Sequence, residues 1–294
     1  NLKNKIQHYT GDINNQENLQ ATISENKPEI IIHLAAQSLV TPSYENPVNT
    51  IQTNVMGTVN LLEAIRHTSS VNACVVMTSD KCYDNKEISY AYKETDPLGG
   101  YDPYSASKGA AEIVTTSYRN SFFNPAKISE HHMGLSTVRA GNVIGGGDWA
   151  KNRLISDCVI ALSKNEPILI RNPDAVRPWQ HVLEPISGIL CLIQKMWDDP
   201  VNYSQAWNFG PMMSNPIIPV SELVSKIISK WGTGHWSDIS NPTSQHEAHL
   251  LMLDSTKANQ HLKWNPIYSI DEAITETINW YAEYLKHSHN MQDF

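Results

Sequence analysis

Two short polar segments contain side chains that could take part in catalysis. The first is a Y-x-x-x-K pair, Tyr104 and Lys108, and a spacing of four residues puts both side chains on one face of a helix, one turn apart. A lysine ammonium beside a phenol favours the phenolate, which would lower the pKa of Tyr104 towards that of a base useful at neutral pH. Because the same spacing occurs by chance on many solvated helices, the pair alone is a weak signal.

The second segment, Thr78-Ser79-Asp80-Lys81, places a hydroxyl, a carboxylate and an amine side by side. A run rich in apolar residues, 71–77, leads directly into it and is typical of a buried strand. A polar strand end followed by a turn is the ordinary interpretation of such a segment. The order found here, a hydroxyl at a strand end and then Y-x-x-x-K on the next helix, favours a catalytic interpretation.

Strands and helices alternate around these two segments. Apolar runs predict three strands, at 29–36, 73–78 and 135–139, of which the first is expected to be buried on both faces. Apolar residues at three- or four-residue spacing predict a helix over 47–67. Asp102-Pro103 provides an N-cap and a first-turn proline for a helix to about Tyr118. This alternation predicts an α/β fold with a doubly wound parallel sheet.

The pattern changes after the glycine-rich stretch at 145–147. Helices are predicted at 153–164, 184–197, 219–231 and 269–286, and short strands at 168–170 and 206–209. We therefore expect a nucleotide-binding domain over 1–150 with part of 171–210, and a smaller, mixed substrate-binding lobe mainly over 151–294. The crevice between two such lobes, at the carboxyl ends of the strands, is where we expect ligands.

Composition and charge exclude several classes of function. The 294 residues are 40% hydrophobic and 18% charged, as in ordinary globular proteins, and the net charge of −8 speaks against nucleic acid or an acidic membrane as a partner. The apolar stretches are too short to span a bilayer, and residues 1–12 lack the apolar region of a signal peptide. The four cysteines lack CxxC spacing, which predicts reduced thiols in a cytoplasmic protein.

Six segments in the same order make the chain resemble a known family, the nucleotide-sugar 4,6-dehydratases among the extended short-chain dehydrogenase/reductases. They are HLAAQ (33–37), TNVMGTVNLLEA (53–64), TSDKCY (78–83), GGYDPYSASKGAAE (99–112), VRAGNVIGGGDWA (138–150) and RNPDAVRPWQHVLEP (171–185). The last two, with Asp-Lys at 80–81 and EAHLLMLDSTKA at 247–258, look like the branch that acts on CDP-glucose. The resemblance implies a Rossmann-type fold and NAD as cofactor.

The family's chemistry implies roles for the residues of both segments. NAD⁺ takes hydride from C4 of the hexose, water is lost across C5–C6, and the hydride returns to C6, giving a 4-keto-6-deoxy sugar for deoxysugar and O-antigen synthesis. Tyr104 would remove the proton of the 4-hydroxyl. Lys108 would hold the nicotinamide ribose and lower the pKa of Tyr104, and Ser79 would hydrogen-bond the same sugar oxygen.

Loss of water needs an acid and a base in addition. By position, Asp80 would be the acid for the leaving 6-hydroxyl, and Lys81 stands where related dTDP-glucose dehydratases carry a glutamate base. A lysine acts as a base only where burial or nearby positive charge lowers its pKa, and Lys108 and the oxidised nicotinamide would supply such charge. Two alternatives stay open: Lys81 stabilises the enolate, or a water removes the C5 proton.

The resemblance also implies contacts to cofactor and substrate. The residues expected to contact the dinucleotide are Asp12, which would bond the adenine amino group, Leu34, Ala35, Ala36, Tyr104 and Lys108. Those expected to bind the pyrophosphate of the sugar nucleotide are Asn142, Arg153 and Arg177. Arginine suits phosphate through its two-pronged donor geometry, although each arginine is also readily explained as a solvated surface residue. Asn54 is expected to be a structural hydrogen-bonder between helix and strands.

Two other patterns are not taken as functional. The stretch 145–150 matches G-x-G-x-x-A, but the dinucleotide motif opens the first βαβ unit, and this stretch follows a later strand. His246-Glu247-Ala248-His249 is too short for H-E-x-x-H, so we expect no metal site.

No glycine-rich turn lies before residue 30, so a first βαβ unit is expected to be missing through truncation or true loss, and the intact set at 79–108 favours truncation. The family is typically dimeric through helices that would correspond to 47–67 and 103–118, so a homodimer is expected for a full-length chain. An epimerase or another dehydratase of the same fold, and a non-catalytic nucleotide-sugar-binding protein, remain alternatives.

Overall fold

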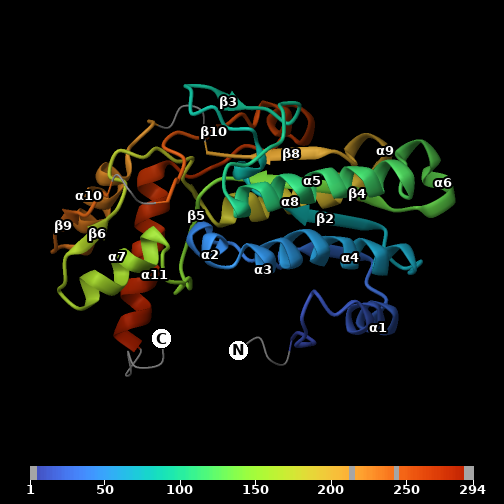
Figure 1. Ribbon diagram of the computed structural model, residues 1–294, viewed down its shortest axis with the longest axis horizontal. Helices are drawn as coiled ribbons and strands as arrows, with labels where there is room; N and C mark the ends of the chain where they lie inside the picture. Colours follow the sequence, from blue (N-terminus) through green and yellow to red (C-terminus); the bar gives the residue numbers. More distant parts are fainter. Residues whose placement is uncertain (1–4, 212–215, 242–244, 288–294) are drawn as a thin grey trace.

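A four-stranded parallel sheet lies at the centre of the larger part of the computed structural model (Figure 1). The structure describes residues 5–211, 216–241 and 245–287. The strands, in their order across the sheet, are β1 (Ile30–His33), β2 (Ala73–Met77), β4 (Gly134–Ala140) and β8 (Ala206–Phe209). Each neighbouring pair is parallel, so the four carboxyl ends meet at one edge of the sheet.

Helices cover both faces of this sheet. The helices concerned are α4 (Gly57–Arg66), α5 (Pro103–Ser121) and α8 (Leu183–Asp198). Ala73 and Val75 of β2 pack in one apolar cluster with α8. Cys74 and Val76 point to the opposite face, where they pack in a second cluster with α4 and α5. The predicted α/β fold with a doubly wound parallel sheet is therefore confirmed.

The first predicted strand differs from the prediction in its burial. We expected 29–36 to be buried on both faces, but β1 is an edge strand, and Ile30 and Ile32 are 42% and 40% exposed. An apolar run indicates a strand, whereas the place of that strand in the sheet depends on contacts with distant residues. His33, at the carboxyl end of β1, is buried.

The helix predicted over 47–67 is present, but its middle is irregular. It consists of α3 (Pro47–Ile51), a π-helical turn (Gln52–Met56) and α4, and it follows α1 (Gln16–Asn26) and α2 (Val40–Glu45). Asn54, in the π turn, is buried, and its Nδ2 atom donates to the Gln37 carbonyl at 2.9 Å and to Ser107 Oγ at 2.8 Å. Asn54 is thus a structural hydrogen-bonder as predicted, but it joins the π turn to the segment after β1 and to α5, and not to a strand.

Helix α5 begins where the sequence predicted. Asp102 is its N-cap, because the Asp102 carboxylate accepts from the amide of Ser105 at 2.9 Å, and Pro103 occupies the first helical position. Tyr104 and Lys108 are both buried along this helix. The cap and the proline therefore fix the start of the element that carries the Y-x-x-x-K pair.

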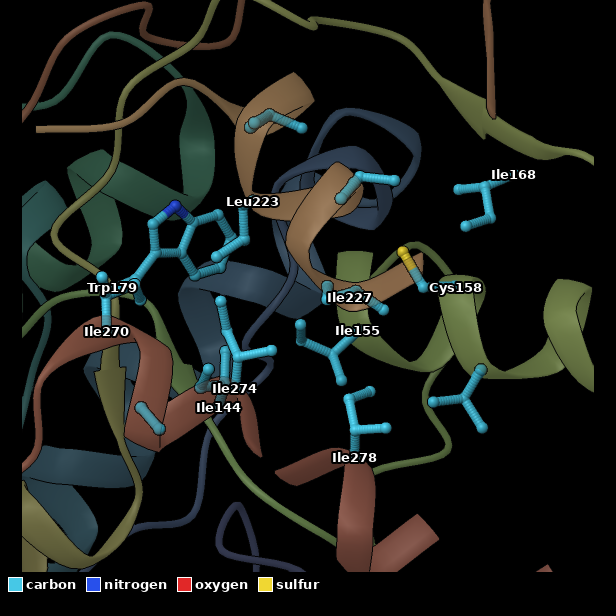
Figure 2. Close-up of a cluster of buried hydrophobic side chains, with 14 of the residues drawn as sticks. Ile144, Ile155, Cys158, Ile168, Trp179, Leu223, Ile227, Ile270, Ile274 and Ile278 are labelled. Atoms are coloured by element: carbon cyan, nitrogen blue, oxygen red, sulfur yellow. The ribbon is translucent and has the colours of Figure 1, made fainter. Parts of the chain in front are cut away.

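The later part of the chain folds around its own apolar cluster, on the left of Figure 1. The elements around it are α7 (Leu154–Ser163), α10 (Val220–Trp231), α11 (Ile270–His287) and the parallel pair β6 (Ile168–Ile170) and β9 (Trp236–Asp238). Figure 2 shows Ile155 and Cys158 beside Ile227, with Ile274 and Ile278 below them. The helices and strands predicted here are confirmed, whereas the boundary between residues 150 and 151 stays a prediction.

The remaining elements are short. They are the strands β3 (Ala91–Tyr92), β5 (Val143–Ile144), β7 (Gln180–His181) and β10 (Met252–Leu253), the helices α6 (Ile128–His131) and α9 (Pro200–Tyr203), and turns at Asp80–Cys82, Pro125–Lys127 and Ala258–Leu262. The four cysteines are free thiols. Within the described ranges, no helix combines the length and the apolar character needed to cross a membrane.

The glycine-rich stretch at 145–147 is explained by close packing. A Cβ atom on Gly146 would lie 2.1 Å from the Trp280 side chain of α11, and Gly147 has a φ of +85°. Side chains are excluded at the first position by space and disfavoured at the second by backbone conformation. The stretch follows β5 in a loop, which agrees with rejecting it as a dinucleotide motif.

Candidate active site

The residues predicted to do chemistry come together at the carboxyl end of β2. Ser79 caps a short 3₁₀ turn over Asp80–Cys82 that follows this strand, and its hydroxyl accepts from the Lys81 amide at 3.2 Å. Helix α5 packs beside the turn, where Lys108 donates from Nζ to the carbonyl of Met77, the last residue of β2, at 3.4 Å. The strand end and the Y-x-x-x-K helix therefore form one site.

Tyr104 and Lys108 lie close together, but the expected effect of the lysine on the phenol is not found. Lys108 Nζ is 6.0 Å from the centre of the Tyr104 ring. Burial raises the pKa of Tyr104 to about 12, against a hydrogen bond with Ser79 and the positive charge of Arg153, which act in the opposite direction. The prediction from spacing fails here because the ammonium is directed to the Met77 carbonyl and desolvation outweighs the remaining charges.

Burial also lowers the pKa values of two basic groups at the site, Lys108 and His33. It lowers the pKa of Lys108 to about 8. It lowers the pKa of His33, at the end of β1, to about 4, and the charge of Lys108 adds to this effect. The His33 Nε2 atom lies 3.2 Å from Thr58 Oγ1. At neutral pH the His33 imidazole is therefore uncharged, whereas Lys108 keeps most of its positive charge, and both lie at the same edge of the sheet.

Asp80 is a buried carboxylic acid with one free oxygen. Asp80 is only 2% exposed. Its Oδ1 atom accepts from the Ser79 hydroxyl at 2.9 Å, and its Oδ2 atom is buried without a hydrogen-bond partner. Burial raises the pKa of Asp80, although the charges of Lys81 and Arg177 and the bond from Ser79 oppose this. A carboxyl group in this environment holds a proton more tightly than an ordinary aspartate.

Lys81 is half-buried and lines a cleft of about 340 Å³. Three segments line the cleft, with Lys81 and 83–87 from the first, 100–102 and Ser105 from the second, and 246–248 and Leu251 from the third. It is rich in polar groups, and at its rim His246 Nε2 lies within hydrogen-bond distance, 2.8 Å, of Glu87 Oε1. The cleft gives solvent or a small polar ligand access to the Lys81 side chain.

The predicted pyrophosphate ligands differ in their surroundings. Arg177 is 7% exposed, its Nη2 atom lies 3.6 Å from Glu247 Oε1, and its charge acts on Asp80. Arg153 is more open and bridges two segments, since it donates to Ser38 Oγ at 2.7 Å and lies 3.2 Å from Asp148 Oδ2. The charge of Arg177 acts on Asp80 and that of Arg153 acts on Tyr104, so both arginines lie near the predicted catalytic residues. Asn142 is partly buried between β4 and β5.

The predicted dinucleotide contacts fall into two places. Leu34 and Ala35 are exposed and Ala36 is partly exposed, directly after the carboxyl end of β1 and next to His33. Asp12 lies in an exposed turn before α1, where its Oδ1 atom accepts from the Asn14 amide at 2.9 Å. The neighbouring Ile13 accepts a bond from Asn60 of α4 through its carbonyl. Asp12 is thus held beside the start of α4, in a loop and not at the end of a strand.

Sequence reasoning missed two residues that support the site, Glu112 and Arg139. They form a buried ion pair with an Oε2–Nη2 distance of 2.8 Å, behind the turn that carries Ser79 and Asp80. A usable signal was present for Glu112, because it follows Lys108 by four residues and so continues the Y-x-x-x-K face. In the described ranges, no cluster of His, Cys, Asp and Glu is arranged to hold a metal ion.

Comparisons with known proteins show the family of this chain. The model of the family described as GDP-mannose 4,6 dehydratase matches residues 1–277. The chain is 46% identical over 285 residues to the CDP-glucose 4,6-dehydratase of Salmonella typhimurium, and the match covers 97% of this chain and 79% of that relative. It is 24% identical to the dTDP-glucose 4,6-dehydratase of Xanthomonas campestris, over 92% of this chain and 77% of that one.

Solved structures share the fold at lower identity. The dTDP-glucose 4,6-dehydratase of Bacillus anthracis, in complex with NAD, superposes with a TM-score of 0.79 at 22% identity, covering 97% of this chain and 83% of that one. The UDP-glucose 4-epimerase of Thermotoga maritima, with UDP-glucose, gives 0.80 at 19% identity, covering 94% and 84%. Because the family model matches residues 1–277 and a relative is 46% identical over 97% of this chain, the chain belongs to the GDP-mannose 4,6 dehydratase family.

Proposed function

We propose that this chain converts CDP-glucose into CDP-4-keto-6-deoxyglucose, with NAD as a cofactor that is regenerated in each turnover. The observation that carries this proposal is the convergence of Ser79, Asp80, Tyr104 and Lys108 at the carboxyl end of β2, in a chain 46% identical to a CDP-glucose 4,6-dehydratase. The reaction class is a hydro-lyase that oxidises C4, removes water across C5–C6 and reduces C6.

The residues at the edge of the sheet suit a dinucleotide. The small side chains of Ala35, which is exposed, and Ala36, which is partly exposed, leave room for a ligand at the end of β1. The charge of the buried Lys108 amine acts on His33, which precedes them at the end of the same strand. Bound NAD would supply reversible hydride acceptance. Lys108 would hold the nicotinamide ribose, and Asp12 would contact the adenine.

In the oxidation step, we assign Tyr104 as the base for the 4-hydroxyl proton and Ser79 as the hydrogen-bond partner of the same oxygen. With its pKa raised to about 12, Tyr104 needs nearby positive charge to form a phenolate at neutral pH. Lys108, one turn along α5, and Arg153, whose charge already lowers the pKa of Tyr104, are the cations available for this.

In the elimination step, we assign Asp80 as the acid that protonates the leaving 6-hydroxyl. Its raised pKa favours a retained proton, and its unpartnered Oδ2 atom leaves one oxygen for the substrate. Lys81, which faces the cleft, would take the C5 proton or stabilise the enolate that forms. Arg177, Arg153 and Asn142 would bind the pyrophosphate.

We also propose a homodimer formed through α3, α4 and α5. Apolar side chains are exposed on α3 and α5, at Val48, Ile51 and Ile113, and on the π turn between α3 and α4, at Met56, with exposed fractions of 40% or more. Exposed apolar side chains gathered on neighbouring helices favour a protein interface. We further propose that the chain consists of a nucleotide-binding domain, 1–150 with part of 171–210, and a substrate-binding lobe, mainly 151–294.

The test of the function is a product assay. The full chain is incubated with CDP-glucose and NAD⁺, and the product is measured by the alkaline absorbance of a 4-keto-6-deoxy sugar and by a mass loss of one water. Tyr104→Phe should lower the rate by about 10²–10⁴-fold, because the proton acceptor is gone. Product from another nucleotide sugar but not from CDP-glucose would refute the substrate, and a C4 epimer without loss of water would refute the reaction class.

A further inference from the structure

We propose that the buried ion pair Glu112–Arg139 positions the catalytic turn, defined here as residues 78–83, from both of its ends. The inference rests on the proposed dehydration, because it assigns the first end to C4 oxidation and the second end to loss of water. Glu112 and Arg139 are positioning residues, since they act through Thr78 and Tyr83.

Thr78 fastens the first end of the catalytic turn. Its Oγ1 atom donates to Glu112 Oε1 at 2.6 Å, and its amide donates to the carbonyl of Val138 in β4 at 2.8 Å. Ser79 is the next residue, so the position of its hydroxyl depends on these two bonds. Thr78, Ser79 and Glu112 are all buried, which keeps water from competing for the bonds.

Tyr83 fastens the second end. Its hydroxyl accepts from Arg139 Nη1 at 2.9 Å and donates to Asn208 Oδ1 of β8 at 2.7 Å. Tyr83 is 1% exposed and Asn208 is fully buried. Tyr83, the last residue of the catalytic turn, is thus held by β4, which pairs with β2, and by β8, which pairs with β4.

One ion pair connects the two anchors. Glu112 Oε2 accepts from Arg139 Nη2 and from Thr137 Oγ1, both at 2.8 Å, and the side chains of Glu112 and Arg139 are 1% and 4% exposed. Burial alone opposes ionisation of Glu112, but the bonds and charge of Arg139 lower its pKa overall. Both partners are therefore charged, and each charge has a hydrogen-bonded partner.

Stability alone is a weak reason for such a pair. Replacing a buried ion pair by well-packed apolar residues is often neutral or stabilising, whereas removing one partner is costly. A role in fixing a conformation explains the pair better, because Glu112 lies on the same helix as Tyr104 and Lys108. One carboxylate therefore sets the distance between the base on α5 and the hydroxyl and acid on the turn.

Between its anchors, the turn is held mainly by backbone bonds: the Cys82 amide donates to the Ser79 carbonyl at 3.2 Å, and the Cys82 carbonyl accepts from the Gly99 amide at 2.9 Å. Asp80 is bonded through its side chain to its neighbour Ser79, and Lys81 faces the cleft. The backbone is held against α5 at Gly109, where a Cβ atom would lie 2.5 Å from the carbonyl oxygen of Gly99 and 3.2 Å from that of Cys82. The positions of Asp80 and Lys81 therefore depend on the backbone between Thr78 and Tyr83.

The experiment compares two conservative variants that each release one end. Tyr83→Phe deletes the hydroxyl at the second end, and Thr78→Val deletes the hydroxyl at the first end, with Thr78→Ser as the variant that restores it. Tyr203→Phe is the control, because its hydroxyl donates to the His261 carbonyl at 3.3 Å, outside the turn. Single turnovers with CDP-glucose and NAD⁺ give the rate of C4 oxidation from the nicotinamide absorbance and the rate of product formation separately.

Tyr83→Phe should slow product formation by about 10–100-fold while C4 oxidation changes by less than about threefold, so that reduced nicotinamide accumulates. Thr78→Val should slow C4 oxidation instead, and Thr78→Ser should recover it. Equal slowing of both steps in both variants would mean a general structural effect and would overturn the proposal. Unchanged kinetics in both variants would overturn it as well.

A second measurement is independent of catalysis. Amide hydrogen exchange at Lys81 and Cys82 should accelerate by about tenfold in Tyr83→Phe and stay unchanged in Tyr203→Phe, because the released end opens more often. Unchanged exchange in Tyr83→Phe would refute the second anchor even if the chain had no activity. An inactive parent chain with accelerated exchange in the variant would refute the proposed function and leave the anchoring intact.

Discussion

Lys108 and Tyr104 lie one turn apart on α5, with the ammonium 6.0 Å from the centre of the phenol ring and bonded to the carbonyl of Met77. Burial disfavours the charged form of both groups. It lowers the pKa of Lys108 to about 8 and raises the pKa of Tyr104 to about 12. The proposed oxidation requires the opposite pairing, an ammonium beside a phenolate. A cost in folding stability at Lys108 is the consequence.

Lys108→Met should therefore stabilise the folded chain at neutral pH. The folded chain releases the Lys108 proton at about pH 8, whereas the unfolded chain holds it to about 10.5, so the stability of the parent rises with pH across this window. Below it, burial of the charged amine costs about 3 kcal/mol. Urea unfolding should show the variant more stable than the parent at pH 7, with the advantage gone by about pH 10.5.

A surface lysine serves as the control for this measurement. Lys127→Met, at a side chain that is 64% exposed, should change stability by less than about 0.5 kcal/mol at either pH. A Lys108→Met chain no more stable than the parent at pH 7 would show that Lys108 is well solvated or well paired in the folded chain.

Lys81→Ala should separate the two halves of the reaction. Oxidation at C4 should continue, because Ser79, Tyr104 and Lys108 are unchanged, whereas loss of water should slow by about 10²–10⁴-fold, as expected for loss of an acid–base group. The variant should accumulate reduced nicotinamide in single turnovers. A fully active variant would remove Lys81 from the mechanism and leave water as the base.

Arg177→Lys should weaken binding of the sugar nucleotide without slowing the chemical step. Lysine lacks the two-pronged donor geometry, and a loss of about 1.4 kcal/mol would raise KM for CDP-glucose about tenfold. Arg171→Lys, at an exposed arginine bonded to Asn152 at 3.4 Å, is the matched control. An unchanged KM in Arg177→Lys would place the pyrophosphate elsewhere.

The proposed dimer predicts a change of mass with a single substitution. Ile113→Lys, on α5 at a side chain that is 61% exposed, should convert a dimer into a monomer in light scattering at micromolar concentration. Ile267→Lys, at a side chain 78% exposed away from these helices, should leave the mass unchanged. A parent chain that is already monomeric would contradict the dimer.

Local sequence patterns predicted the ends of helices and strands well where those ends depend on neighbouring residues. The cap at Asp102 and the apolar run before Thr78 fixed the start of α5 and the end of β2 because both depend on neighbouring residues. The exposure of Ile30 could not be predicted in this way, since it follows from β1 lying at the edge of the sheet. Strand order is a property of the whole chain.

The sequence predicted which residues lie at the site, but not the direction in which the pKa of Tyr104 shifts. Ser79, Asp80 and Lys108 lie together at the end of β2, as the order of the motifs predicted, and their roles stay predictions. The raised pKa of Tyr104 was not foreseen, because desolvation depends on every neighbour and not on the one lysine at the right spacing. Arg139 was missed for a similar reason, since its partner Glu112 is 27 residues away in sequence.

The most direct measurement of the proposed function follows the hydrogen at C4 of the substrate. CDP-glucose carrying deuterium at C4 is converted by the full chain with NAD⁺, and the product is analysed by NMR. We expect the deuterium at C6 of a 4-keto-6-deoxy sugar, because the hydride removed by oxidation is the one that returns. Deuterium retained at C4, or lost to solvent, would contradict the proposed reaction.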